Sequence, residues 1–197
     1  MNAFIVISAA IAILCYIPLC RNIYSGIAKQ NLLTWALWCS LDAVVAATLI
    51  TQRGNFLLAV AYTVGSGVTA VFILRTGDHA SWTWFHTMVV GLVIASMAVW
   101  YFSGSRMATI AGTTAMLIAG MPQLVDVWKR PKESPTLIYS AYVVANCLAV
   151  AGGRDWSVEE RFYPVSAGVF CLLITVVSLR KFLPQPAQIT IPRESSS

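Results

Sequence analysis

Long apolar runs separated by short polar segments make up most of this chain. Seven of these runs are about 17 to 21 residues long and hold at most one charged residue each: 4–20, 32–50, 56–74, 82–102, 107–127, 136–152 and 162–179. At about 1.5 Å per residue, an α-helix of this length crosses the hydrocarbon layer of a membrane, which is roughly 30 Å thick. The pattern therefore predicts seven transmembrane helices and an all-α membrane protein.

The composition favours the same class of protein. Of the 197 residues, 58% are hydrophobic and only 11% are charged, whereas about 25% charged residues are usual in soluble domains. The longest segment outside the runs is 180–197, which is too short for an aqueous domain. Its end, 183–197, is rich in proline and serine and is predicted to be a disordered cytoplasmic tail.

The basic residues predict the orientation of the helices. Nine of the 13 Lys and Arg residues fall in the first, third and fifth loops and in the tail, and four fall in the alternate loops. Because the side richer in Lys and Arg faces the cytoplasm, the N-terminus is expected outside and the C-terminus inside. The net charge of +5 comes from scattered residues and not from a basic patch. Nucleic acid is therefore not an expected partner.

Side chains that bind metals or cofactors are poorly placed in this sequence. All five cysteines lie within the runs, where small buried apolar residues are expected and disulfides are not. His79 and His86 have no Cys or carboxylate at the spacing of zinc ligands. A retinal Schiff base requires a buried lysine, but every lysine lies outside the runs: Lys29, Lys129, Lys132 and Lys181. We expect no metal and no cofactor.

The last three runs repeat features of the first three. A shift of 104 positions without a gap places Pro18 on Pro122. It also aligns two copies of one pattern. In this pattern an aromatic residue is followed by a second aromatic residue three positions later, and then by an acid or an amide four positions after that. The pattern consists of Trp35, Trp38 and Asp42 in the first copy and of Tyr139, Tyr142 and Asn146 in the second. This registration indicates an internal duplication.

A duplicated three-helix unit needs one additional helix. Three helices cross the membrane an odd number of times, so a second copy stands the same way up only when a further span precedes it. The expected architecture is therefore 3+1+3 with parallel repeats. Its parts are a first repeat 1–76, a linker helix 77–103, a second repeat 104–182 and the tail 183–197.

This architecture, with Met121-Pro122-Gln123 ending a helix and an outward N-terminus, resembles the SWEET and PQ-loop (MtN3/saliva-like) transporter superfamily over about residues 4–182. The first copy has Pro18-Leu19 where the proline–glutamine pair of the family would stand. In sugar-carrying members, an asparagine on the third helix of each repeat contacts the substrate. The corresponding runs here offer Tyr62, Ser66 and Ser166 and no asparagine, so sugar specificity does not follow.

A second resemblance is to a group of bacterial seven-span proteins whose substrate we cannot name. It rests on Tyr16-Ile17-Pro18, followed by Arg21, Gly26, Lys29, Thr34-Trp35 and Trp38. The two resemblances together imply a transporter in a bacterial cytoplasmic (inner) membrane. They also imply alternating access around a cavity between spans two, three, six and seven.

Asp42 is the only ionisable residue near the middle of any run. Such an acid costs about 2.5 to 3.5 kcal/mol on insertion scales, so a functional role is the default hypothesis. Trp35 and Trp38 precede it by seven and four residues and share its helical face. Two roles stay open, which are binding a coupling proton and pairing with a cationic group of the substrate. The alternative is a neutral Asp that hydrogen-bonds to neighbouring helices.

Further candidates accompany Asp42. The predicted substrate-binding residues are Trp38, Asp42, Tyr62, Ser66, Tyr142, Asn146 and Ser166. Trp35 and Tyr139, one turn nearer the cytoplasm, are favoured as interfacial anchors. Pro18 and Pro122 are predicted to kink their helices and to act as hinges, with Gln123 satisfying a carbonyl that Pro122 frees.

The sequence therefore favours a membrane transporter of a small polar solute, with Asp42 as the candidate proton or cation site. The main alternative is a seven-helix receptor or sensor that binds a ligand without transporting it. An enzyme is not expected. The predicted partners are the solute and membrane lipid, and assembly into a homo-oligomer stays open, as do the identity of the solute and the direction of flux.

Overall fold

The structure, a computed structural model, describes residues 2–26, 32–76, 84–131 and 134–182. Within these residues the regular structure is entirely helical. The elements are α1 (Ala3–Tyr24), α2 (Leu32–Thr51), α3 (Leu57–Thr76), α4 (Trp84–Lys129), α5 (Thr136–Gly152), the π-helix η2 (Val158–Phe162), α6 (Tyr163–Ser178) and the 3₁₀-helix η3 (Leu179–Phe182). The predicted disordered tail 183–197 lies outside the described residues, as do Lys29, His79 and Lys132.

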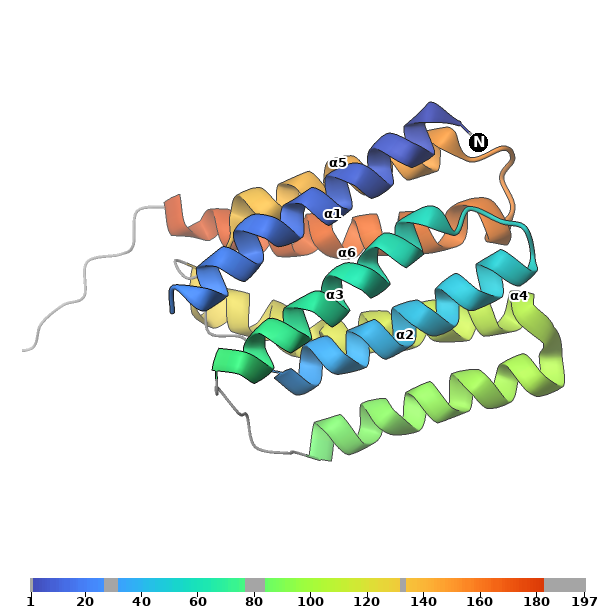
Figure 1. The fold of residues 1–197 in the computed structure, drawn as a ribbon, viewed down its shortest axis with the longest axis horizontal. Coiled ribbons are helices and arrows are strands. Elements are labelled where there is room, and N and C mark those ends of the chain that lie inside the picture. Colours follow the sequence, from blue (N-terminus) through green and yellow to red (C-terminus); the bar gives the residue numbers. More distant parts are fainter. Residues whose placement is uncertain (1, 27–31, 77–83, 132–133, 183–197) are drawn as a thin grey trace, which may run out of the picture.

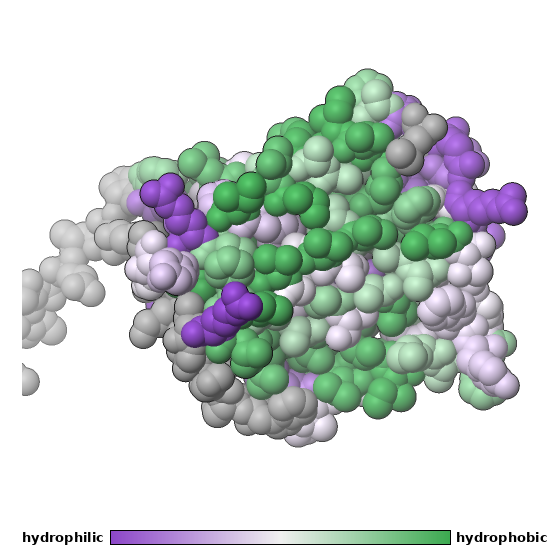
Figure 2. Space-filling model, viewed as in Figure 1, coloured by the Kyte–Doolittle hydropathy of each residue, from purple (hydrophilic) through white to green (hydrophobic). Residues whose placement is uncertain are grey.

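Five helices in the described part of the chain are long and apolar enough to cross a membrane. They are α1, α2, α3, α4 and the segment Val158–Phe182 that contains α6, while α5 is apolar but shorter, at 17 residues. Hydrophobic side chains cover the middle of the face drawn in Figure 2, and hydrophilic ones gather at its two ends. Long apolar helices with an apolar outer surface indicate an integral membrane protein.

Helix α4 reverses its direction at Gly104. This residue has φ 83° and ψ 174°, a region that is essentially restricted to glycine. The chain folds back at this point, so α4 consists of two antiparallel arms, 84–103 and 105–129 (Figure 1). Across the turn, the indole N–H of Trp100 donates to Ser105 Oγ at 3.2 Å. The described part of the predicted run 82–102, residues 84–102, falls in the first arm, and the run 107–127 falls in the second.

The helices pack in two groups of three. In the first, α3 contacts both α1 and α2; in the second, α6 contacts both α5 and α4, and it meets α4 through the arm 105–129. We call α1, α2 and α3 the first triplet, and the arm 105–129, α5 and α6 the second triplet. The triplets meet where α1 packs on α5 and α2 packs on α4. The arm 84–103 lies at the edge of the bundle (Figure 1).

Two glycines allow a close approach of helices within the triplets. In the first triplet, the ring of Tyr16 on α1 lies against Gly65 on α3, where an added Cβ would overlap it. In the second, the ring of Phe170 on α6 lies in the same way against Gly120 on α4. Small residues at helix contacts are a usual means of tight packing in membranes, where a hydrophobic driving force between helices is lacking.

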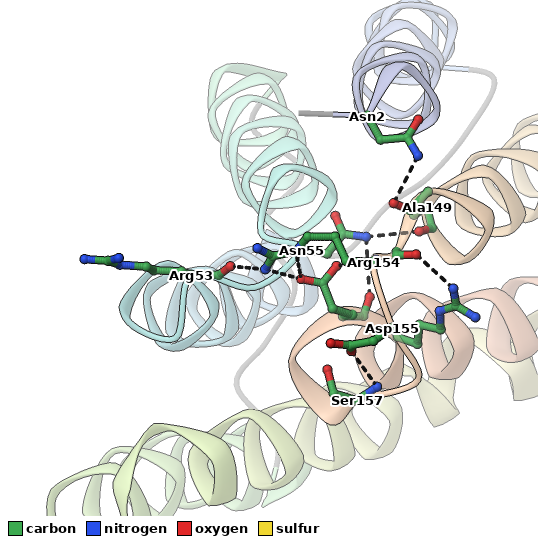
Figure 3. Close-up of polar contacts among 11 residues, drawn as sticks. Asn2, Arg53, Asn55, Ala149, Arg154, Asp155 and Ser157 are labelled. Atoms are coloured by element: carbon green, nitrogen blue, oxygen red, sulfur yellow. Dashed lines mark hydrogen bonds and ion pairs between the residues drawn. The ribbon is translucent and has the colours of Figure 1, made fainter.

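A polar network joins the two triplets at the end of the bundle where α1 begins (Figure 3). The side-chain amide of Asn55, after α2, donates to the carbonyl of Ala149 on α5 at 3.0 Å. The guanidinium of Arg154, after α5, pairs with the carboxylate of Glu160 and donates to the carbonyl of Arg53. Glu160 is only 2% exposed. We call this set of contacts the terminal network.

Replacing either packed glycine is expected to destabilise the fold. Gly65→Ala and Gly120→Ala each place a methyl group into an aromatic ring, and such overpacking costs about 1 to 3 kcal/mol. Both variants should therefore lower the melting temperature of the purified protein in detergent.

The matched control is Gly91→Ala on the exposed arm 84–103, where an added Cβ meets nothing within 4 Å. Because alanine favours the helix by about 0.5 to 1 kcal/mol, this variant should melt at the same or a higher temperature. Equal melting shifts for all three variants would contradict the packing described here.

Candidate functional site

A cavity of about 70 Å³ lies between the two triplets. All six of their helices contribute to its wall. The lining residues are Tyr16, Trp35, Trp38, Asp42, Tyr62, Ser66, Met116, Tyr139, Tyr142, Tyr163, Ala167, Phe170 and Cys171. The volume corresponds to roughly two water molecules at about 30 Å³ each.

Helical periodicity explains how α2 and α5 line the cavity. Residues three and four apart lie on one face of a helix, and this spacing separates Trp35, Trp38 and Asp42 along α2. The same spacing on α5 brings Tyr139 and Tyr142 to the cavity. Each helix therefore supplies an aromatic stripe, and on α2 the stripe ends at a carboxylate.

Asp42 is the only acidic residue among those that line the cavity. Its side chain is buried, with 6% of the residue exposed, and the hydroxyl of Tyr163 donates to its Oδ1 at 2.9 Å. The structure gives its second carboxylate oxygen no hydrogen bond from another described residue, and no Lys, Arg or His is among the residues that line the cavity. A buried carboxylate without a counter-charge is costly. This carboxyl group therefore has to be protonated or has to face a bound cation.

Asn146 also hydrogen-bonds to a tyrosine of the other triplet. It is 1% exposed, and its Nδ2 donates to the hydroxyl of Tyr62 at 2.6 Å and to the carbonyl of Tyr142 at 2.8 Å. Its Oδ1 has no partner among the described residues. Asp42 on α2 is thus bonded to α6, and Asn146 on α5 is bonded to α3. Both bonds join one triplet to the other.

The predicted substrate-binding residues are largely brought together. Five of them line the cavity: Trp38, Asp42, Tyr62, Ser66 and Tyr142. Asn146 contacts that wall through Tyr62. Ser166 is half-buried on α6 and does not line the cavity.

Sequence reasoning did not select several other wall residues. Trp35 and Tyr139 were expected as interfacial anchors, but both are buried in the cavity wall. Tyr163 was not among the predicted residues; the shift of 104 positions pairs Tyr62 with Ser166. Tyr163 stands one turn before Ser166, so a search of one turn on either side of the matched position would have found it.

The predicted hinge residues lie away from the cavity wall. Pro18 is inside α1, and Pro122 is inside the arm 105–129 of α4. Both stand in the half of their helix that is distant from the terminal network. The structure gives the side chain of Gln123 no hydrogen bond with another described residue.

The described residues contain no group of three or more His, Cys, Asp or Glu side chains placed to hold a metal ion. Comparisons of the chain with protein-family models, with curated proteins and with solved structures found no match. The chemistry of the cavity is therefore the main guide to function.

Removing the hydroxyl of Tyr163 should destabilise the protein. Tyr163→Phe deletes the one hydrogen bond that Asp42 receives from the described residues, and a buried polar group left without its partner costs about 1 to 3 kcal/mol. The melting temperature in detergent should fall.

Tyr139→Phe is the matched control, because Tyr139 lines the same cavity and the structure gives its hydroxyl no hydrogen bond from another described residue. This variant should melt close to the parent protein. A fall as large as that of Tyr163→Phe would show that the bond to Asp42 contributes no particular stability.

Proposed function

We propose that this protein is a seven-span membrane transporter that moves a small polar solute by alternating access. The observation that carries the proposal is the cavity between the two triplets, where a buried carboxyl group and a buried amide are each hydrogen-bonded across the interface. A polar site at a joint between two helical groups is where transporters of this design bind their substrate.

Seven spans follow when the two arms of α4 are counted separately. The turn at Gly104 returns the chain to the opposite end of the bundle (Figure 1), and α5 supplies a short sixth span. The arm 84–103 then serves as the linker, and the two triplets are the parallel repeats of a 3+1+3 architecture. This assignment agrees with the resemblance to the SWEET and PQ-loop transporters.

The packing order within the triplets supports a duplication. In each triplet the third helix along the chain lies in contact with the other two. Each triplet also has one aromatic ring against one glycine, between its first and third helices. Tyr16 and Gly120 are 104 positions apart, and Gly65 and Phe170 are 105 apart, so the ring and the glycine stand on exchanged helices, within one residue of the shift. An exchange of this kind keeps the first and third helices of a triplet equally close, although the residue on each helix is different.

Alternating access requires the triplets to rock about a joint. The terminal network joins the triplets at the end where α1 begins, and the mid-depth bonds of Asp42 and Asn146 join them at the cavity. Pro18 and Pro122 are proposed as hinges, because a proline removes a helical hydrogen bond and weakens the turn before it. With the N-terminus outside, the terminal network closes the outer side of the cavity.

Asp42 is proposed as the group that binds a coupling proton or a cationic group of the solute. Its burial without a counter-charge supports both roles, since a proton and a cation each remove the cost of the isolated carboxylate. A receptor or sensor on this scaffold would bind a ligand in the same cavity but would not release it on the other side.

Transport and the role of Asp42 are tested in liposomes that contain the full chain. The parent protein should exchange at least one labelled solute from a panel of sugars, amino acids, amines and vitamins, and a pH gradient should drive its accumulation. Asp42→Asn should abolish this accumulation. If Asp42 carries only the proton, exchange without a gradient should persist, and if it binds the solute, exchange should fall as well.

Asp126→Asn is the matched control, because that carboxyl group is 57% exposed and stands 4.0 Å from Arg130 on the surface. It should transport as the parent does. Full gradient-driven accumulation by Asp42→Asn would exclude the proton role. Ligand binding without any exchange by the parent protein would exclude transport and support the receptor.

A further inference from the structure

The wall of the cavity is mainly aromatic. Eight of the residues that line it have aromatic rings: Tyr16, Trp35, Trp38, Tyr62, Tyr139, Tyr142, Tyr163 and Phe170. Each aromatic ring has a negative face and a positive edge, and cations bind to the faces by electrostatic attraction. A wall that is rich in such rings is therefore suited to hold a cation.

The rings form a connected set around the cavity. Ring centroids are 5.2 Å apart for Trp35 and Trp38, 6.1 Å for Tyr16 and Trp35, and 5.7 Å for Tyr16 and Tyr142. Tyr142 continues the set to Tyr62, with centroids 5.4 Å apart. Each of these residues is held by its neighbours, so the rings form a pre-arranged cage, which a ligand small enough to fit the cavity has little need to reorganise.

The ionised groups reinforce this preference for positive charge. Asp42 is the one acid among the lining residues, and none of them is basic. One of its oxygens accepts from Tyr163, while the other receives no hydrogen bond from the described residues and is available to a ligand. An anionic ligand would meet this carboxylate without a compensating Lys or Arg.

Few polar groups remain for a neutral sugar, which needs a partner for each of several hydroxyls. The hydroxyl of Ser66 is already bonded to the carbonyl of Tyr62 at 2.6 Å, and that of Tyr163 to Asp42. The indole N–H of Trp38 and the hydroxyl of Tyr142 have no hydrogen-bond partner among the described residues, and the structure gives the hydroxyl of Tyr139 none either. These three uncharged groups, one carboxylate and many rings match a small cation with a few polar atoms.

We infer that the solute is a small organic monocation, an amine or a quaternary ammonium ion, held by Asp42 and the surrounding aromatic cage. The assignment of this ligand as cargo rests on the proposed transport function, whereas its binding rests on the cavity alone. The volume of about 70 Å³ sets the scale of the ligand to a few non-hydrogen atoms, and larger cations require the rings to move apart.

The first experiment compares two probes of the same shape. Choline has a positively charged nitrogen at the position where 3,3-dimethylbutan-1-ol has a neutral carbon. Binding of each to the purified full chain in detergent is measured by titration calorimetry, with methylammonium and tetramethylammonium added to grade the size. Choline should bind at least about tenfold more tightly than the alcohol, since a desolvated cation–π contact and a carboxylate act only on the charge.

A second probe, phosphocholine, distinguishes a free cationic solute from the headgroup of a lipid, which carries the same ammonium group. Its phosphate group would lie near Asp42 and should weaken binding at least about tenfold relative to choline. Equal affinity for choline and phosphocholine would assign the site to lipid headgroups and overturn the assignment to a free solute.

Two variants and two matched controls locate the site. Asp42→Asn and Trp38→Leu should each reduce choline affinity by about tenfold or more. Asp126→Asn removes an exposed acid, and Trp84→Leu removes a tryptophan that is 79% exposed and outside the cavity. Both controls should bind choline as the parent does. Equal losses in variants and controls would place the binding elsewhere.

The outcomes for binding and for transport are distinguishable. Equal affinity for choline and its neutral isostere overturns the cation inference, even when another solute is exchanged by liposomes and transport stands. Binding of choline that depends on Asp42, with no exchange of choline or of any solute in the panel, keeps the cation site and overturns transport. Because the probe comparison uses the unmodified protein, poor folding of a variant does not weaken the test.

Discussion

The structure depends on one electrostatic constraint, which is that a carboxyl group inside an apolar helix bundle must be neutralised. Asp42 is buried, receives one hydrogen bond from Tyr163, and lines a cavity whose described wall residues include no basic side chain. The free energy of leaving that carboxylate alone is high. The negative charge of Asp42 therefore has to be compensated, either by a proton on the carboxyl group or by a cation in the cavity. The aromatic wall makes a cation an acceptable partner.

The polar contacts between the triplets are concentrated at two depths. At mid-depth, Asp42 and Asn146 bond across the interface; at the end where α1 begins, the terminal network does the same through Asn55 and Arg154. Close to that end, Thr48 and Gln52 of the first triplet also hydrogen-bond to the hydroxyl of Thr109 in the second, each at 2.9 Å. A rocking motion would have to break the terminal network while the cavity bonds adjust to the solute. Under the proposed mechanism, occupancy of the cavity and opening of that end are therefore linked.

Much of the fold was predictable because a membrane imposes a single length and composition on every span. The apolar runs predicted the helices, and the three- and four-residue spacing placed Trp38 and Asp42 on one wall. The partner of Asp42 was not predictable from the shift of 104, since Tyr163 stands one turn away from the matched serine. The terminal network was missed for another reason. Glu160 and Arg154 look like ordinary loop charges in the sequence, and only the folded chain brings Glu160 to 2% exposure.

The two triplets differ in ways that compensate each other. Tyr163 donates to Asp42, whereas Asn146 donates to Tyr62, so the direction of the hydrogen bond is reversed between the two sites. The aromatic ring and the glycine of each close contact are also exchanged between helices. Each triplet thus has one ring against one glycine and one polar group bonded across the interface, and of these two polar groups only Asp42 can carry a charge. Asp42 is the one acid among the lining residues, so under the proposal above the cavity binds a single positive charge.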